Sequence, residues 1–278
     1  MNELIDFNAL QNQYIEQNLN FDRADFATAE EYEDAMLERS YELSEQFLNE
    51  PSDSLDGKSP VEFFEQMNAK ELLDTLYSYY LEMDDMPDAI VQVLQHRQDA
   101  AEGMLKLLKD DQNEEWFRIS LIDLLLQLEY KPALKYYCDI IFRSTEHDDL
   151  ADAAVDALKQ LDGAEVEREL MSLFDEASDD AKYRMLDLLA VPNCDDKIFE
   201  YVLHKLTEEK GMREIFAYYI GRIDDSRALP FLHDISEEED LDYVDYMEIR
   251  NAIERLGGSC IERDYKNDPL YAKIHGDI

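Results

Sequence analysis

The side chains of this chain that could do chemistry are a few histidines set among many carboxylates. His204 and His233 are 29 positions apart, and Asp234 follows His233 directly. Imidazole nitrogens and carboxylate oxygens on neighbouring helices can hold a divalent metal ion that activates water for hydrolysis. The pattern therefore permits one alternative function, a metal-dependent helical hydrolase of the His/His-Asp type. The further Asp that such a site needs would fall at the very end of this sequence or beyond it.

The rest of the sequence argues against catalysis. A His-Asp pair means little in a chain so rich in Asp, and His147-Asp148 is a second one. No HExxH, GxSxG, phosphate-binding glycine loop or Cys/His nucleophile pair occurs. A loose likeness to a calcium loop fails because Ser52, Ser54 and Phe63 stand where an EF-hand needs carboxylates. We predict a non-enzymatic protein with no catalytic, metal-binding or cofactor-binding residue.

The net charge restricts the partners. The 278 residues include 26 Lys and Arg against 67 Asp and Glu, a formal charge of −41. Such a charge repels phosphate backbones and anionic lipids, so we expect no nucleic-acid or membrane partner. It attracts basic proteins and peptides. Solubility and adaptation to high salt remain alternative explanations, and in every case added salt should relieve self-repulsion.

Cysteine usage and hydropathy predict a cytoplasmic setting. Cys138, Cys194 and Cys260 are odd in number, far apart and free of any CxxC spacing. The first residues lack the basic start and apolar run of a secretory signal, and no apolar run approaches the length of a membrane span.

A helical pattern recurs along residues 113–257. The apolar-Arg pairs Phe117-Arg118, Tyr183-Arg184, Met212-Arg213 and Ile249-Arg250 each open a run of apolar residues at helical spacing. A fifth copy has Asp152 in place of the Arg. The marker positions average about 33 residues apart, a period typical of stacked helix pairs that bury their apolar faces only against each other.

This pattern resembles the HEAT repeat over roughly residues 98–257. An Asp in the turn between helices precedes the Arg, as in Asp111 with Arg118, Asp180 with Arg184, and Asp240 with Arg250. The resemblance implies an all-α, right-handed α-solenoid of antiparallel helix pairs. It also implies an interaction scaffold with a concave groove. HEAT-like proteins include a DNA glycosylase branch, but its groove is basic.

The chain is expected to have three segments. Residues 1–58 form an N-terminal helical extension and loop, residues 59–258 the HEAT-like array, and residues 259–278 a polar tail that is partly ordered at best. Capping boxes, in which a Ser or Thr and a Glu three residues later satisfy each other's amides, are predicted at Thr28, Ser59 and Ser236. Gly257-Gly258 is expected to end the last helix of the array.

Two sets of residues are candidates for the site. Arg118, Arg184, Arg213 and Arg250 form either an anion-binding row or, as we favour, structural pairs with acids of neighbouring turns. Tyr137, Tyr218 and Tyr243 are candidate partner-binding residues, because Tyr supplies contact area with a polar tip. Packing with one Tyr of each pair in the core is the alternative.

The sequence thus favours a scaffold with an acidic, Tyr-rich surface for a basic protein or peptide, one form being an inhibitor or immunity-type protein. Its oligomeric state is left open. For stability, Leu203 is expected at the centre of a buried apolar stripe. Glu208 and Glu238 are expected outside it, where substitution has little effect.

Overall fold

The computed structural model describes residues 4–20, 26–266 and 268–275, without the side chains of Ala272 and His275. These ranges contain helices and irregular segments but no strand, and an isolated bridge pairs Ser52 with Lys58. The prediction of an all-α protein is confirmed. No helix in these ranges combines the length and the apolar composition needed to cross a membrane.

The chain divides into two compact units, Met1–Ala133 and Leu134–Ile278. The predicted segment boundaries after residues 58 and 258 each fall inside one of these units. Residues 1–3 and 21–25 of the predicted extension, and residues 267 and 276–278 of the predicted tail, lie outside the described residues.

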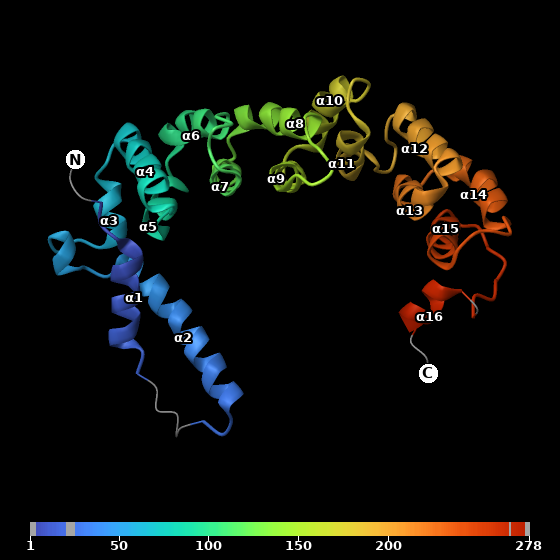
Figure 1. Cartoon of the computed structure of the whole chain (residues 1–278). Coiled ribbons are helices and arrows are strands. Elements are labelled where there is room, and N and C mark those ends of the chain that lie inside the picture. The colour runs from blue at the N-terminus through green and yellow to red at the C-terminus, as the bar shows by residue number, and fades with distance from the viewer. Residues whose placement is uncertain (1–3, 21–25, 267, 276–278) are drawn as a thin grey trace. The chain divides into compact units, whose positions relative to one another are not determined.

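The first unit holds the helices that are blue to green in Figure 1. Its α-helices are α1 (Phe7–Asn18), α2 (Ala29–Asn49), α3 (Pro60–Glu65), α4 (Ala69–Met83), α5 (Asp88–Leu94), α6 (Ala101–Leu108) and α7 (Glu115–Gln127). Single 3₁₀ turns lie between them at Asp53–Leu55 and Gln98–Ala100, and a third follows α7 at Lys131–Ala133.

An aromatic cluster anchors α1 to the rest of the first unit. Phe7 is only 3% exposed, and its ring lies 5.8 and 5.0 Å from the rings of Phe63 and Phe64, centroid to centroid. The Tyr79 hydroxyl on α4 donates to the carbonyl of Ile5 at 3.0 Å. Burial raises the pKa of Tyr79 to about 12. The N-terminal segment is therefore held by buried aromatic contacts, which its polar sequence did not suggest.

The second unit holds the remaining helices. They are α8 (Leu134–Phe142), α9 (Asp149–Leu158), α10 (Gly163–Leu173), α11 (Asp179–Leu189), α12 (Asp196–Glu208), α13 (Arg213–Ile223), α14 (Leu229–Ser236), α15 (Tyr243–Arg255) and α16 (Pro269–His275). Its 3₁₀ turns are Lys210–Met212 and Ser226–Ala228. Neighbouring helices pack as pairs, with α8 against α9, α12 against α13, and α14 against α15.

Consecutive pairs of the second unit contact each other as well. The helices α9 and α11 pack together, and α13 packs closely on α15 (Figure 1). At that contact a Cβ atom added to Gly221 would lie 3.4 Å from the Cα of Ala252, so a side chain there would crowd the helices. This packing of helices in neighbouring pairs is compatible with a helical repeat.

The described part of the C-terminal tail packs on α15 and on the turn before it. Arg263 donates to the carbonyls of Ser236 and Glu238 at 3.0 and 2.7 Å. The Tyr246 hydroxyl on α15 donates to the carbonyl of Ile261 at 2.6 Å. Hydrogen bonds to backbone carbonyls, made by residues with no periodic pattern, hold this segment.

Two of the three predicted capping boxes are present. Thr28 and Ser59 each accept from the amide of the glutamate three residues later, and that glutamate reaches back to the cap. The box predicted at Ser236 is wrong, because Ser236 ends α14 and its hydroxyl donates to the carbonyl of His233. Asp242 caps α15. As predicted, α15 is followed by a left-handed Gly257, with φ of +79°.

The buried face of α12 is centred one position away from where the sequence predicted it. Ile198, Phe199, Val202 and Leu206 are buried, whereas Leu203 is half-buried beside them. Because an α-helix turns by 3.6 residues, a stripe through Val202 and Leu206 leaves Leu203 at its edge. The expectation that Leu203 lies at the centre is wrong.

Candidate functional site

Two marker arginines, Arg184 and Arg213, bind acids of a neighbouring element. The Nε of Arg184 on α11 lies 2.7 Å from the Asp152 carboxylate on α9, and its Nη atoms donate to the carbonyls of Thr145 and Glu146. Arg213 on α13, with a side chain 4% exposed, binds both carboxylate oxygens of Glu238 at 2.8 Å. Asp152, which stands where the other copies carry Arg, is thus the acid that the next marker arginine binds.

The other two marker arginines differ in what they contact. The Nε of Arg118 on α7 donates to the carbonyl of Leu108 at 3.0 Å, at the end of α6. Arg250 pairs with Glu254 on its own helix at 2.7 Å. Arg184 and Arg213 thus form ion pairs with acids of another element.

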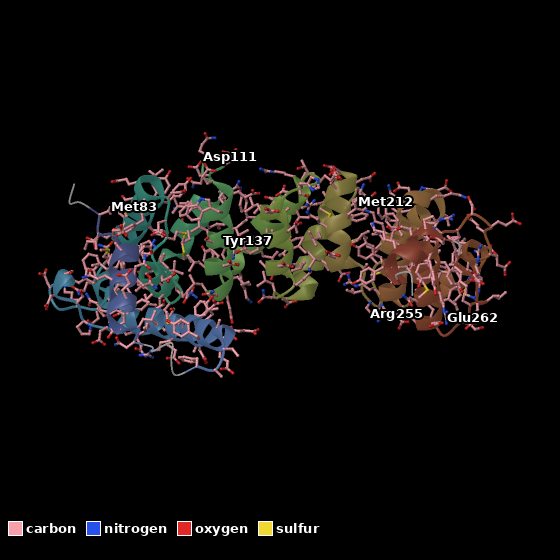
Figure 2. The ribbon with its side chains drawn as sticks, turned by 60° about the horizontal axis from the view of Figure 1, so that its bottom comes forward. Met83, Asp111, Tyr137, Met212, Arg255 and Glu262 are labelled. Carbon is pink, nitrogen blue, oxygen red and sulfur yellow. The ribbon has the colours of Figure 1, made fainter. Side chains whose placement is uncertain are left out.

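The three candidate tyrosines lie in different environments. Tyr137 on α8 is 1% exposed, so its side chain is part of the core and is not offered to a partner (Figure 2). Tyr243 is half-buried, with its ring 5.5 and 5.0 Å from those of Tyr265 and Tyr271 in the C-terminal tail. Tyr218 on α13 is 46% exposed and is the one of the three offered to solvent.

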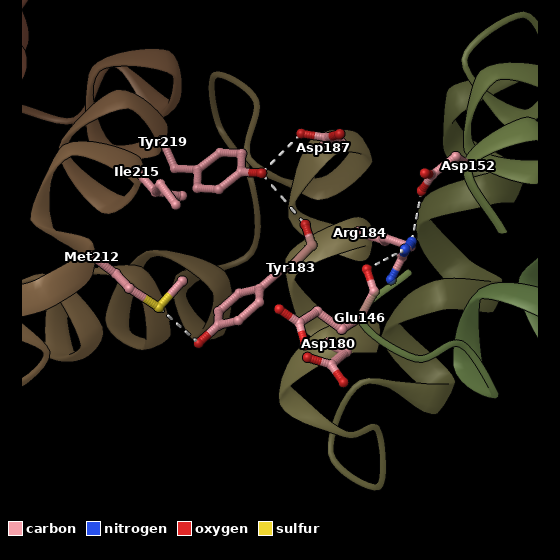
Figure 3. A pocket seen from close by; sticks show the side chains of 9 residues that line it. All are labelled: Glu146, Asp152, Asp180, Tyr183, Arg184, Asp187, Met212, Ile215 and Tyr219. Atoms are coloured by element: carbon pink, nitrogen blue, oxygen red, sulfur yellow. Dashed lines mark hydrogen bonds and ion pairs between the residues drawn. The ribbon is translucent and has the colours of Figure 1, made fainter. Parts of the chain in front are cut away.

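A hollow of about 320 Å³ lies between α11 and α13, next to Tyr218. Tyr218 does not line the hollow, but its ring lies 5.5 Å from that of Tyr219, which does. Figure 3 shows the side chains around it. The lining residues are Glu146, Asp152, Asp180, Tyr183, Arg184, Asp187, Met212, Ile215 and Tyr219.

Side-chain contacts join α11 and α13 around this hollow. The Tyr219 hydroxyl donates to the Asp187 carboxylate at 2.8 Å, and Arg222 donates to the Asp187 carbonyl at 3.1 Å. The Tyr183 hydroxyl lies 3.6 Å from the Met212 sulfur (Figure 3). Burial raises the pKa of both tyrosines, so their hydroxyls keep their protons at neutral pH.

The carboxylates of the hollow fall into two classes. Asp152 is bound by Arg184, and Asp187 by Tyr219 and Arg222. Glu146 and Asp180 have no ion-pair or hydrogen-bond partner for their side chains among the described residues, and no dashed line reaches either carboxylate in Figure 3. The hollow thus combines an excess of negative charge with aromatic and apolar surface.

Other hollows lie in the first unit and differ in character. One of about 580 Å³ beside α2 and α5 is lined mostly by neutral polar side chains, including Gln11, Ser44, Asn49, Gln92 and Gln95. A second, of about 260 Å³, has a single carboxylate, Asp123. Neither offers the concentration of charge that a strongly ionic partner requires.

Within the described residues, the histidines do not form part of a metal-binding cluster. His204 is exposed on α12 and His233 lies on α14. Over residues 4–20, 26–266 and 268–275, no three side chains of the metal-binding types come together in positions that could hold an ion.

Sequence reasoning missed several lining residues of the hollow, although a signal for two of them existed. Tyr183 and Met212 both stand immediately before a marker arginine, so they occupy equivalent places in successive copies. The structure brings these two side chains into contact. Glu146 lies in the turn before α9, outside any periodic pattern, and carried no signal.

Comparisons with known proteins return no match to this chain. No protein-family model matches it, and neither a curated protein nor a solved structure does.

A buried carboxyl, that of Asp245, lies beside the half-buried Glu214 where α13 meets α15. Asp245 is 7% exposed, and one of its oxygens accepts from the amide of Glu214 at 3.0 Å. Loss of hydration raises the pKa of Asp245 to about 7, and the neighbouring Glu214 carboxyl and Asp242 charge add to the effect. Burial beside a second carboxyl therefore favours the protonated form of Asp245.

Glu238→Gln should destabilise the protein by about 2 kcal/mol, because the buried Arg213 loses its charged partner while the partly exposed site admits some water. Its pairing with Arg213 holds the pKa of Glu238 near 2, so its stabilisation is present above pH 4.5 and lost as the pH falls toward 2. Urea unfolding at pH 7 measures the loss, with the exposed Glu208→Gln as the control of equal charge change. Equal effects of the two substitutions would show that Glu238 is the solvated residue the sequence suggested.

Asp245→Asn should raise the free energy of unfolding at pH 8 by about 1–3 kcal/mol and change it little at pH 4. The folded pKa of Asp245 lies above its ordinary value of 3.8, so its stabilising contribution is full below that value. It is lost as the pH rises through about 7. Asn keeps an oxygen for the Glu214 amide and cannot ionise. Urea unfolding at both pH values checks this, with the Glu208→Gln protein as the control of equal charge change. An Asp245→Asn protein less stable than this control at pH 8 would contradict the prediction.

Proposed function

We propose that this protein is a non-catalytic scaffold that binds a basic protein or peptide at the α11–α13 hollow. The observation that carries the proposal is the lining of that hollow, where four carboxylates surround one arginine whose charge Asp152 already balances. Such a surface attracts cations from a distance and offers apolar contact once they arrive.

We further propose that the helix pairs are HEAT-like repeats of an α-solenoid. Support comes from side chains at equivalent places of successive copies, because Arg184 binds Asp152 and Tyr183 contacts Met212. Stacked repeats bring equivalent positions together in this way.

The proposed partner excludes two other classes of ligand. Nucleic acid and anionic lipid need cations to replace their counterions, and this chain at −41 has few to offer. A reducing, cytoplasmic setting fits the three free cysteines, of which Cys138 is buried. One form of this function is an inhibitor or immunity-type protein that covers the basic active site of an enzyme.

Fluorescence anisotropy with a labelled basic peptide tests the function. The double variant Glu146→Gln, Asp180→Asn should weaken binding about fivefold, because each carboxylate contributes up to about 1 kcal/mol. Raising sodium chloride from about 20 mM to about 300 mM should slow association more than it changes dissociation.

The matched control is Glu200→Gln with Asp234→Asn, two carboxylates on α12 and α14 that do not line the hollow. It changes the net charge equally and should leave the affinity within about twofold. Equal losses in the two double variants, or no binding at low salt, would refute the proposed site. Duplex DNA should not bind either protein.

A further inference from the structure

We infer that the α11–α13 hollow takes an arginine side chain of the partner, with its guanidinium between Glu146, Asp180 and the ring of Tyr183. This inference rests on the proposed function and names the group that the site selects.

The chain's own arginines show how such a group is held. Arg227 pairs with Asp196 and Asp225, each at 2.6 Å, and its guanidinium carbon lies 4.3 Å from the centre of the Phe199 ring. The site of Arg227 thus has two components. Its carboxylates accept hydrogen bonds, and its aromatic face attracts the cation.

In a second arginine site, that of Arg263, backbone carbonyls take the place of the carboxylates. The Arg263 guanidinium lies 5.9 and 5.4 Å from the ring centres of Tyr246 and Tyr265 while it donates to the Ser236 and Glu238 carbonyls. Oxygen acceptors beside an aromatic ring are thus a recurring cation site in the second unit, where they also hold Lys197 beside Phe174 and Lys205 beside Tyr201.

The hollow has these components but no cation of its own in that position. Arg184 points to Asp152 and to two backbone carbonyls, which leaves the Glu146 and Asp180 carboxylates unpaired among the described residues (Figure 3). These carboxylates come from two separate elements, the turn before α9 and the first turn of α11. Both line the hollow and lie on the same side of the Tyr183 ring in Figure 3, and a guanidinium has enough N–H donors for two carboxylates.

Apolar lining favours arginine over lysine. Met212 and Ile215 cover one side of the hollow, and Ile215 is 37% exposed, so a long side-chain stem finds apolar contact there. A guanidinium is more weakly hydrated than an ammonium and stacks on an aromatic face, so it loses less on entering such a site. Charge alone does not favour arginine over lysine. A lysine can also lie against a ring, as Lys205 does 5.7 Å from the centre of the Tyr201 ring.

The test compares two labelled peptides of equal length and charge, one with three arginines and one with three lysines, binding to the full chain. We expect the arginine peptide to bind about fivefold more tightly, because a guanidinium stacks on the ring and loses less hydration than an ammonium does. Tyr183→Phe should keep this ratio because the ring remains. Tyr183→Leu should bring it close to one.

The outcomes separate this inference from the proposed function. If both peptides bind equally while the Glu146→Gln, Asp180→Asn protein loses affinity for both, the arginine assignment is overturned and the acidic site stands. If the arginine preference is unchanged in Tyr183→Leu, the preference arises elsewhere and the assignment is also overturned. Failure of both peptides to bind would overturn the site itself. A thermal melt of each Tyr183 variant confirms that it is folded.

Discussion

The shortage of positive charge is the constraint on which this structure depends. With 26 Lys and Arg against 67 Asp and Glu, each cation is scarce, and many of them bind across elements. Arg184 joins α11 to α9, Arg213 joins α13 to the turn after α14, and Arg263 joins the tail to that same turn. These three contacts place positive charge where elements of the second unit meet.

The consequence is a surface with a large excess of unpaired carboxylates. Isolated carboxylates on exposed helix faces have only water around them. At the α11–α13 hollow they lie beside tyrosine rings and apolar side chains, and this is where we propose that the same charge serves binding. The distinction between the two roles lies in the neighbouring groups and not in the carboxylates themselves.

The repeat register predicted more of the site than the residue types did. In the repeat that we propose, marker positions are equivalent places of successive copies, which explains the contacts of Arg184 with Asp152 and of Tyr183 with Met212. Helix starts at Thr28 and Ser59 followed from local capping chemistry alone. Such features depend on spacing within one chain segment, which a sequence displays directly.

Features set by tertiary packing could not be predicted in this way. Tyr137 and Tyr218 both sit beside another tyrosine, yet one is buried and the other exposed, because neighbouring helices cover only the first. From the sequence, Glu238 was expected to be a solvated acid. In the structure it pairs with the buried Arg213 of α13. Phe7 carries no periodic signal and is nevertheless the residue that fixes α1.

The melting temperature as a function of sodium chloride concentration tests the central claim, that most carboxylates lack a cationic partner. Salt screens repulsion between exposed charges, with a Debye length that falls from about 30 Å at 0.01 M to about 3 Å at 1 M. We expect the melting temperature to rise over this range and then level off, because the few buried pairs such as Arg213 with Glu238 are screened far less. A melting temperature that falls steadily with added salt would contradict the claim, since the carboxylates would then be held mainly in attractive pairs.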